Sequence, residues 1–322
     1  IDSLASFVEK MAQRSGRYVS YAQPLLDGTL PDGSRVNATY TKDVTSRGPT
    51  FTVRKFTKIP WTPIQLLNLK TLSPEMLAYF WILLEHKSSL LISGGTASGK
   101  TTLLNALAFF IPPEARVVSI EDTREINLPR ENWLPSVVRS GVSGQGVGEV
   151  DMFTLLRGSF RQNPDYVVVG EVRGKETYVL FQGMASGHSS FATFHAASVE
   201  TLVKRLETPP INLPASLVDS LDIIISVVHI KDQTRNVRRV NEVKEIIEVK
   251  QQVGTVDSNT LFEWDPVKDK FIFNGNSHIL SIISKRTGLS VKQLENEVRT
   301  RAMLLQKLLD KGITNYKEFT KI

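Results

Sequence analysis

Residues 94–101 read GGTASGKT, a stretch that fits the phosphate-binding pattern G-x-x-x-x-G-K-[ST]. Directly before it, residues 89–93 (SLLIS) form a short apolar run of strand length. After it, residues 102–110 (TLLNALAFF) carry helical apolar spacing that stops before Pro112 and Pro113. Because context confirms such a pattern, the order of strand, loop and helix predicts a nucleoside triphosphate site rather than a chance glycine-rich turn.

The residue types of this loop each suit a triphosphate. Glycine permits backbone conformations in which successive N–H groups converge on phosphate oxygens at the positive end of a helix. We expect Lys100 to contact the β- and γ-phosphates and the Thr101 hydroxyl to be a ligand of Mg²⁺. The nucleotide-binding candidates are Gly94, Gly95, Thr96, Ala97, Ser98, Gly99, Lys100, Thr101 and Thr102.

Length and composition indicate a soluble protein of more than one domain. The 322 residues, with 41% hydrophobic and 22% charged, exceed the usual size of a single domain. The absence of cysteine excludes disulfides and thiolate metal sites and fits a reducing compartment. The chain starts at Ile1 without a signal-peptide pattern, which we interpret as a fragment end. Its longest apolar stretches are far shorter than the roughly 20 residues that span a bilayer.

Most of the net charge of +6 lies in residues 277–322, where nine Lys or Arg stand against four Asp or Glu. Such a basic tail suits an acidic protein partner, lipid headgroups or nucleic acid. A solvated helical face explains the same charges without any partner. The tail therefore leaves its function open.

The apolar pattern divides the chain into four parts. Residues 1–56 combine a helical run with short strand-like pieces, which predicts a small α+β domain with an antiparallel sheet. Residues 57–73 are proline-containing and are expected to be a linker. Residues 74–276 alternate apolar strands with helical patterns, which predicts an α/β domain with a mainly parallel sheet. Residues 277–322 carry helix-face spacing and predict a C-terminal helical subdomain.

Within these parts, some elements are specific enough to place. The N-terminal strand-like pieces are VSYAQPLL, RVNATYT and FTVRKF, and the later ones are SLLIS, RVVSIED, DYVVVGE, SSFATFH, IIISVVHI and VNEVKEIIEV. The last two are expected to form an antiparallel pair across a polar turn at residues 232–236. A helix is expected from Pro74, with Ser73 as its N-cap, to about His86.

Two of the expected strands end in carboxylates. Glu171 ends the run PDYVVVGE, and Glu121 with Asp122 ends the run RVVSIED. Ligands of parallel sheets bind at the carboxyl ends of strands, so these acids are expected to face bound phosphates. One acid would activate water and the other would hold the hydration shell of the metal. Taken alone, Glu171 is better explained as an exposed acid at a strand end, and Glu121 or Asp122 could instead cap a turn.

Two histidines and two arginines are further candidates. His188 and His195 flank a strand-like segment, where a structural hydrogen-bonding role and sensing of phosphate are both open, and a metal site lacks a third ligand. Arg35 and Arg54 lie on expected strands of the N-terminal part. An arginine delivered across a domain or subunit boundary stabilises charge on the γ-phosphate. From the residues alone, a surface ion pair is the first explanation of both arginines.

Together these motifs resemble the type II/IV secretion ATPase superfamily, the motors of pilus assembly, the archaeal flagellum and secretion systems. The similar segments, in order, are GGTASGKTT for Walker A, SIEDTREINLP for the Asp box, RQNPDYVVVGEVRGKET for Walker B and GHSSFATFHA for the His box. LPDGSRVNATY and FTVRKF extend the resemblance into the N-terminal part, and IEDTREINLP looks archaeal. The resemblance implies a RecA-like P-loop NTPase core that hydrolyses ATP with Mg²⁺.

The resemblance also assigns roles to the acids and histidines. It implies that Glu171 and Glu121 serve water activation and metal coordination. It implies that His195, with His188, lies near the γ-phosphate and reports its state. It also matches Arg35 to an arginine that the N-terminal domain brings to the nucleotide when the lobes close, and Arg54 to a second.

As partners, the resemblance implies a homo-hexameric ring and a polytopic platform protein of the cytoplasmic membrane. It implies a cytoplasmic protein, peripheral at that membrane, for which acidic lipid is a further candidate partner and nucleic acid is not expected. A departure from many bacterial members is the lack of a four-cysteine zinc module, where the basic helical tail stands instead. Gly170, rather than an acid, precedes Glu171, as is usual in this family.

Two other functions compete with the secretion motor. A RecA-like nucleic-acid translocase would suit the sequence pI of about 9.4. Against it, no stretch interleaves aromatic with basic residues as a strand-binding groove does. The other hypothesis is a nucleotide-gated assembly protein that binds ATP and scarcely hydrolyses it. The acids at the strand ends argue against this hypothesis.

Overall fold

The computed structural model describes residues 2–139, 148–231, 235–250 and 252–320. The chain forms two compact units, each with its own sheet and core. The smaller unit comprises Ile1–Lys58 together with Thr123–Glu125, and the larger unit comprises Ile59–Asp122 and Ile126–Ile322.

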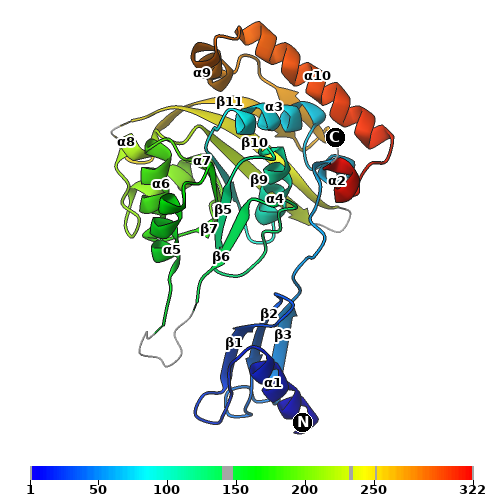
Figure 1. The fold of residues 1–322 in the computed structure, drawn as a ribbon, viewed down its shortest axis with the longest axis vertical. Helices are drawn as coiled ribbons and strands as arrows, with labels where there is room; N and C mark the ends of the chain where they lie inside the picture. Colours follow the sequence, from blue (N-terminus) through cyan, green and yellow to red (C-terminus); the bar gives the residue numbers. More distant parts are fainter. Residues whose placement is uncertain (1, 140–147, 232–234, 251, 321–322) are drawn as a thin grey trace. The chain divides into compact units, whose positions relative to one another are not determined.

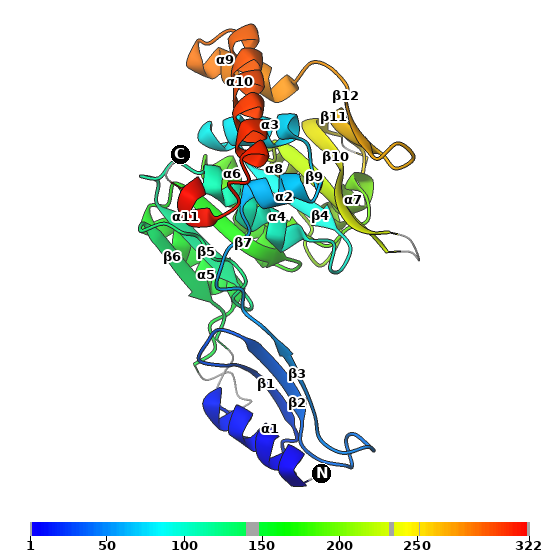
Figure 2. The same ribbon diagram turned by 90° about the vertical axis from the view of Figure 1, so that its right-hand side faces the viewer.

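The smaller unit packs helix α1 (Asp2–Arg14) on an antiparallel sheet in the order β1-β2-β3 (Figure 2). The strands are β1 (Leu25–Thr29), β2 (Arg35–Thr39) and β3 (Thr50–Arg54). The sheet confirms the α+β prediction, although the expected strand VSYAQPLL pairs only from Leu25 onward. The residue before it, Pro24, has no N–H to give to a ladder. The core is small and consists of Val8, Met11, Ala12, Leu26, Val36 and Ala38.

The larger unit is built on a nine-stranded sheet in the order β12-β11-β10-β9-β4-β8-β7-β5-β6 (Figure 1). The strands are β4 (Leu90–Gly94), β5 (Val117–Glu121), β6 (Trp133–Val137), β7 (Tyr166–Val172), β8 (Ser189–Phe194), β9 (Ile223–Lys231), β10 (Asn236–Val249), β11 (Val256–Asp265) and β12 (Lys270–Phe273). Strands β4 to β9 pair in parallel, which confirms the predicted α/β class. The predicted antiparallel pairing of β9 with β10 is also present, while residues 232–234 of its turn lie outside the described residues.

Helices cover both faces of this sheet (Figure 1). They are α2 (Pro63–Asn68), α3 (Pro74–Glu85), α4 (Lys100–Leu107), η1 (Ala108–Phe110), α5 (Met152–Ser159), η2 (Phe160–Gln162), α6 (Glu176–Ala185), α7 (Val199–Glu207), α8 (Ala215–Val218), α9 (His278–Thr287), α10 (Val291–Asp310) and α11 (Tyr316–Phe319). Alternation along β4 sends Leu90 and Ile92 into the core under α3, α4 and α10, and Leu91 into the core under α5 to α8. The carboxyl edge of the sheet is thereby held between two packed layers.

Local sequence signals fix the helices at their ends. Ser73 accepts the N–H of Met76 at 3.2 Å, which confirms the predicted N-cap of α3. At the start of α9, the fully buried Glu245 of β10 accepts the N–H of His278 at 2.7 Å and the Tyr79 hydroxyl at 2.5 Å. Burial, together with the Glu245 carboxylate, raises the pKa of Tyr79 well above its ordinary value. The C-terminal helices are thus tied to the sheet and to α3.

Among the described residues, no helix combines the length and the apolar character that crossing a bilayer requires.

Candidate active site

The P-loop joins β4 to α4, and its backbone requires glycine at two positions. Gly94 pairs with Val227 of β9, and a Cβ at Gly94 would lie 2.4 Å from the Val227 carbonyl oxygen. Gly99, the N-cap of α4, has a φ of 97°, and Ala97 also lies in the left-handed region with a φ of 58°. Steric contact therefore explains the first motif glycine and backbone conformation explains the second.

The side chains of the loop form a donor set suited to phosphate. Lys100 is the first residue of α4 and only 9% exposed. Its Nζ donates to the carbonyl oxygens of Gly94 at 3.1 Å and Gly95 at 2.8 Å. The buried Ser98 Oγ has no hydrogen-bond partner among the described residues, and Thr101 is half-buried in the first helical turn. An ammonium, hydroxyl groups and the positive end of a helix fit a triphosphate with its Mg²⁺.

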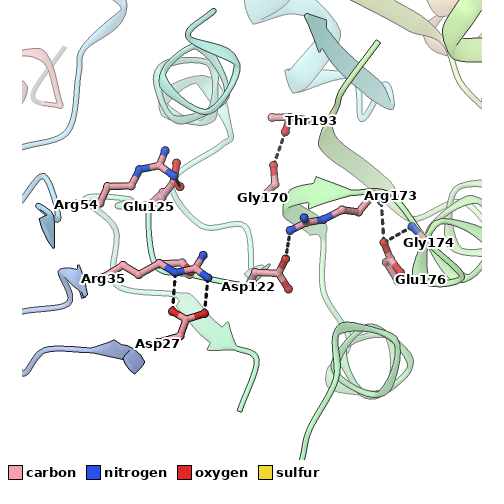
Figure 3. A network of polar contacts seen from close by, with 11 residues as sticks. Asp27, Arg35, Arg54, Asp122, Glu125, Gly170, Arg173, Gly174, Glu176 and Thr193 are labelled. Carbon is pink, nitrogen blue, oxygen red and sulfur yellow. Dashed lines mark hydrogen bonds and ion pairs between the residues drawn. The ribbon is translucent and has the colours of Figure 1, made fainter. Parts of the chain in front are cut away.

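Glu121 lies at the carboxyl end of β5 and is 2% exposed. Its Oε1 accepts the N–H of Ile126 at 2.7 Å. On the neighbouring strand β7, a Cβ at Gly170 would lie 3.2 Å from Glu121 Cγ, so the glycine leaves room for the glutamate. Thr193 of β8 donates to the Gly170 carbonyl oxygen at 2.6 Å (Figure 3). The ends of β5, β7 and β8 thereby hold Glu121 in one position.

Glu171 follows Gly170 and is half-buried. The sequence predicts that this acid ends its strand, whereas β7 continues to Val172. Beyond the strand, the N–H groups of Arg173 and Gly174 both donate to Glu176 Oε1, at 2.8 Å and 2.7 Å. These bonds fix the turn that follows Glu171 (Figure 3).

Asp122, the residue directly after β5, forms an ion pair with Arg173 (Figure 3). The pair links the segment after Glu121 to the segment after Glu171. Both side chains are substantially exposed, so the pair is worth little to stability, about 0–1 kcal/mol. Its effect is to keep two loops at the carboxyl edge together.

The two histidines lie at opposite ends of β8. His195 follows the carboxyl end of the strand and is exposed, and its carbonyl oxygen accepts a hydrogen bond from Arg205. His188 precedes the strand, and its ring meets the Phe160 ring edge-on with centroids 4.9 Å apart. Because β8 runs parallel to β4, His195 lies at the P-loop edge and His188 at the opposite edge. The structure therefore brings His195, and not His188, to the candidate site.

The two arginines belong to the smaller unit, where they are opposite each other on β2 and β3. Arg35 donates to both carboxylate oxygens of Asp27, at 3.1 Å and 2.9 Å, and its Nη1 donates to Thr123 Oγ1 at 3.0 Å. Arg54 forms an ion pair with Glu125 at 2.9 Å (Figure 3). Both arginines are thus anchored by oxygen atoms of their own unit.

The motifs of this site follow the order of a known family. The sequence profile of the family described as "Type II/IV secretion system protein" matches residues 4–314. The chain belongs to this family. The profile covers both compact units, so the smaller unit of this secretion-family protein is part of the shared architecture.

Relatives of this secretion-family protein occur in archaea and bacteria. An uncharacterized protein of Methanocaldococcus jannaschii is 40% identical over 317 residues, which cover 97% of this chain and 57% of the relative. The type IV secretion system protein PtlH of Bordetella pertussis is 31% identical over 229 residues, covering 64% of this chain and 67% of PtlH. The chain thus spans little more than half the length of the first of these relatives.

Among solved structures, the chain is similar in fold to the Yersinia pseudotuberculosis ATPase DotB. The TM-score is 0.52 at 15% identity, and the match covers 99% of this chain and 81% of that one.

Sequence reasoning missed two residues that shape the site of this secretion-family protein. Thr193 lies inside the expected strand SSFATFH, where its hydroxyl among apolar neighbours was the only signal that it needs a hydrogen-bond partner on the next strand. Arg238 lies near the start of β10, and its Nε donates to the carbonyl oxygen of Ala97 at 3.1 Å. No local pattern predicts this contact, because the two residues are 141 positions apart.

Proposed function

We propose that this chain is an ATP-hydrolysing motor that couples nucleotide-driven domain closure to protein secretion or to assembly of a pilus-like or archaellum-like filament. One observation carries the proposal. The P-loop follows β4, the buried Glu121 ends β5, and the half-buried Glu171 lies one residue before the end of β7, so all three are at the carboxyl edge of one sheet. A loop that binds phosphate and acids that serve hydrolysis therefore share an edge.

In this proposal the large unit binds the substrate and supplies the acids. Lys100 and the N–H groups of the loop bind phosphate oxygens, and the Thr101 hydroxyl holds Mg²⁺. When bound, the metal neutralises charge on the phosphates. Glu171 orients the attacking water and accepts its proton, while Glu121 holds the metal's hydration shell. The fixed position of Glu121 against Gly170 suits that role because it needs no rearrangement.

The smaller unit and β8 supply the response to the γ-phosphate. His195, at the P-loop edge, reports the state of the γ-phosphate. Arg35 and Arg54 compensate the charge that develops during hydrolysis when the lobes close. The proposal gives His188 no part in the chemistry, because it lies at the opposite end of β8.

The working assembly in this proposal is a homo-hexamer at the cytoplasmic face of the membrane, bound to a polytopic platform protein. The family match supports it, as does the basic C-terminal part, which suits acidic lipid. Light scattering of the protein with ATP should give the mass of six chains, and a mass that stays at one chain would contradict the ring.

The chemical part is tested by turnover and by nucleotide binding measured separately. Lys100→Ala should abolish both. Glu171→Gln should keep binding and lose turnover by roughly a hundredfold or more, because a positioned base contributes that much. Glu248→Gln, which changes an exposed acid of β10, is the control and should retain full turnover. Undiminished hydrolysis by the Glu171 variant would overturn the proposal.

A RecA-like nucleic-acid translocase is the second candidate, and the sequence pI of about 9.4 favours it. It predicts that single-stranded DNA stimulates ATP hydrolysis in a salt-sensitive manner. Stimulation by vesicles that contain acidic lipid, with none by DNA, would support the secretion motor instead.

A further inference from the structure

The sheet topology brings β10 to the P-loop. Strand β9 runs parallel to β4 and β10 runs antiparallel to β9, so the amino end of β10 lies at the carboxyl edge of the sheet. Gly94 is opposite Val227, and β9 continues beyond it to Lys231. The paired ends of β9 and β10 therefore flank the loop, and Arg238, which pairs with His229, lies in this ribbon.

Arg238 lies on the face of the sheet that carries α4. Val240, two residues further along β10, is buried in the same core as Leu103 and Leu104 of α4. Residues two apart on a strand point to the same face, so Arg238 continues this face toward the loop. Its position there follows from the strand and not from a flexible loop.

The side chain of Arg238 lies directly against the P-loop. Its Nε donates to the carbonyl oxygen of Ala97 at 3.1 Å. A Cβ placed at Gly99 would lie 3.1 Å from Arg238 Cδ, so the arginine stem covers the second motif glycine. The contact holds Ala97, whose φ of 58° is costly for a residue other than glycine.

Within the part of the chain that the structure describes, the charge of Arg238 is not paired with an acid. Among the described residues, no carboxylate forms an ion pair with its guanidinium, and the side chain is exposed. A guanidinium stays charged at all working pH values, and its N–H groups match phosphate oxygens. The loop that it contacts also contains the buried Ser98 Oγ, which has no hydrogen-bond partner among the described residues.

We propose that Arg238 is a second cationic residue of the nucleotide site, which holds the P-loop through Ala97 and binds phosphate oxygens through its guanidinium. This inference rests on the proposed nucleotide site and adds a residue to it on the β10 side of the loop. Lys100 and Arg238 then act from different elements, one from the start of α4 and the other from the neighbouring ribbon.

The test compares three variants at Arg238 in the full chain. Arg238→Lys keeps the charge, Arg238→Met keeps the stem over Gly99 without the charge, and Arg238→Ala removes both. Affinity is measured for fluorescent ATP and, by competition, for inorganic tripolyphosphate, each with Mg²⁺. Arg235→Ala is the control, since this exposed arginine of the same ribbon contacts the Pro266 carbonyl oxygen instead.

We expect Arg238→Ala and Arg238→Met to bind tripolyphosphate and ATP roughly tenfold to a hundredfold more weakly, with partial recovery in Arg238→Lys. Thermal midpoints without nucleotide should not change. Recovery of affinity in Arg238→Met would show that only packing on Gly99 matters, and would overturn the inference. Loss of affinity for ATP but not for tripolyphosphate would also overturn the inference, because it would show that Arg238 does not bind the phosphates.

Failure of the proposed nucleotide site would look different. In that case the unaltered chain would bind neither probe, and Lys100→Ala would change nothing. If the unaltered chain and Arg235→Ala bind both probes and Arg238→Ala binds them equally well, only the inference about Arg238 is wrong.

Discussion

The larger and smaller units hold their candidate functional cations in opposite ways. Lys100 of the larger unit is 9% exposed and is bonded to carbonyl oxygens of its own loop. In the smaller unit, the side chains of Arg35 and Arg54 are 42% and 68% exposed, and both pair with carboxylates. The larger unit has cores on both faces of its sheet, whereas six buried residues form the core of the smaller unit in its described part.

In the proposed function, this difference separates nucleotide binding from the response to it. A buried ammonium must keep its oxygen partners, so the P-loop is organised for phosphate before a nucleotide arrives. Exposed ion pairs contribute only about 0–1 kcal/mol, so the arginines can exchange a carboxylate for a phosphate at little cost. We infer that the larger unit binds the nucleotide and that the arginines of the smaller unit respond to its phosphates.

The largest effect on nucleotide binding is expected from breaking the organised loop. In Gly94→Ala the new Cβ would lie 2.4 Å from the Val227 carbonyl oxygen, so β4 or the loop must shift. A displacement of about 1 Å in an active site costs roughly a hundredfold in rate, and a loss of the loop's geometry is expected to weaken phosphate binding on a similar scale. We therefore expect nucleotide affinity, measured with fluorescent ATP, to fall by at least that factor.

Gly95→Ala is the matched control for this change. A Cβ at Gly95 meets no atom within 4 Å, so this variant should bind ATP nearly as well as the unaltered chain. Equal losses in the two variants would show that any side chain in this part of the loop is harmful, and that the contact with β9 is not the reason.

The next largest effect is expected in the small core. Leu26 of β1 is buried there, and Leu26→Ala should lower the free energy of unfolding of the smaller unit by about 2–5 kcal/mol. Limited proteolysis should then cut within residues 2–58 while ATP affinity persists. The exposed neighbour Leu25 gives a control, and Leu25→Ala should resist the protease. A parallel loss of ATP affinity in Leu26→Ala would show that the units do not respond separately.

The parts that the sequence predicted correctly are those whose signals are local. The P-loop lies between β4 and α4 as expected. Ser73 caps α3 because its side chain accepts an N–H only three residues away, from Met76. The parallel strands are continuous apolar runs because helices cover both faces. In contrast, β6 contains Pro135, which argues against a strand except at a sheet edge, and β6 is an edge strand.

The parts that could not be predicted depend on long-range contacts. The anchoring of Arg54 by Glu125 joins residues far apart in the chain, as does the contact of Arg238 with Ala97. His188 and His195 looked equivalent in the sequence, and only the direction of β8 separates them. Register and strand direction place side chains at one edge or the other, and neither can be read from a single segment.

The buried Arg239 extends the comparison of the two units to the dependence of stability on pH. The Arg239 side chain is 5% exposed and its Nε donates to Asp269 at 2.9 Å. The Arg239 hydrogen bonds, with help from Trp264, lower the pKa of Asp269 to about 2. A lowered carboxyl pKa contributes stability above the unfolded value, near 4, and that contribution is lost as the pH falls toward 2.

The measurement is the urea midpoint of the unaltered chain and of Asp269→Asn across that range. The variant should be less stable at pH 5, and the difference should shrink steadily down to pH 2. A difference that stays constant with pH would mean that packing, and not the charged pair, explains the loss.

Arg54→Ala is expected to have the smallest effect on stability among these variants, and its expected effect is on ATP turnover. Arg54→Ala removes an exposed ion pair and should change the free energy of unfolding by less than about 1 kcal/mol. If the arginine compensates charge on the γ-phosphate, ATP turnover should nevertheless fall roughly a thousandfold, with ATP affinity nearly unchanged. Glu125→Gln removes the same pair from the other side while leaving the arginine in place. Full turnover in Glu125→Gln beside lost turnover in Arg54→Ala would assign the effect to the arginine. Equal losses in the two would assign it to the pair, and the smaller unit would then be a support for the loop after β5 and not a responder to phosphate.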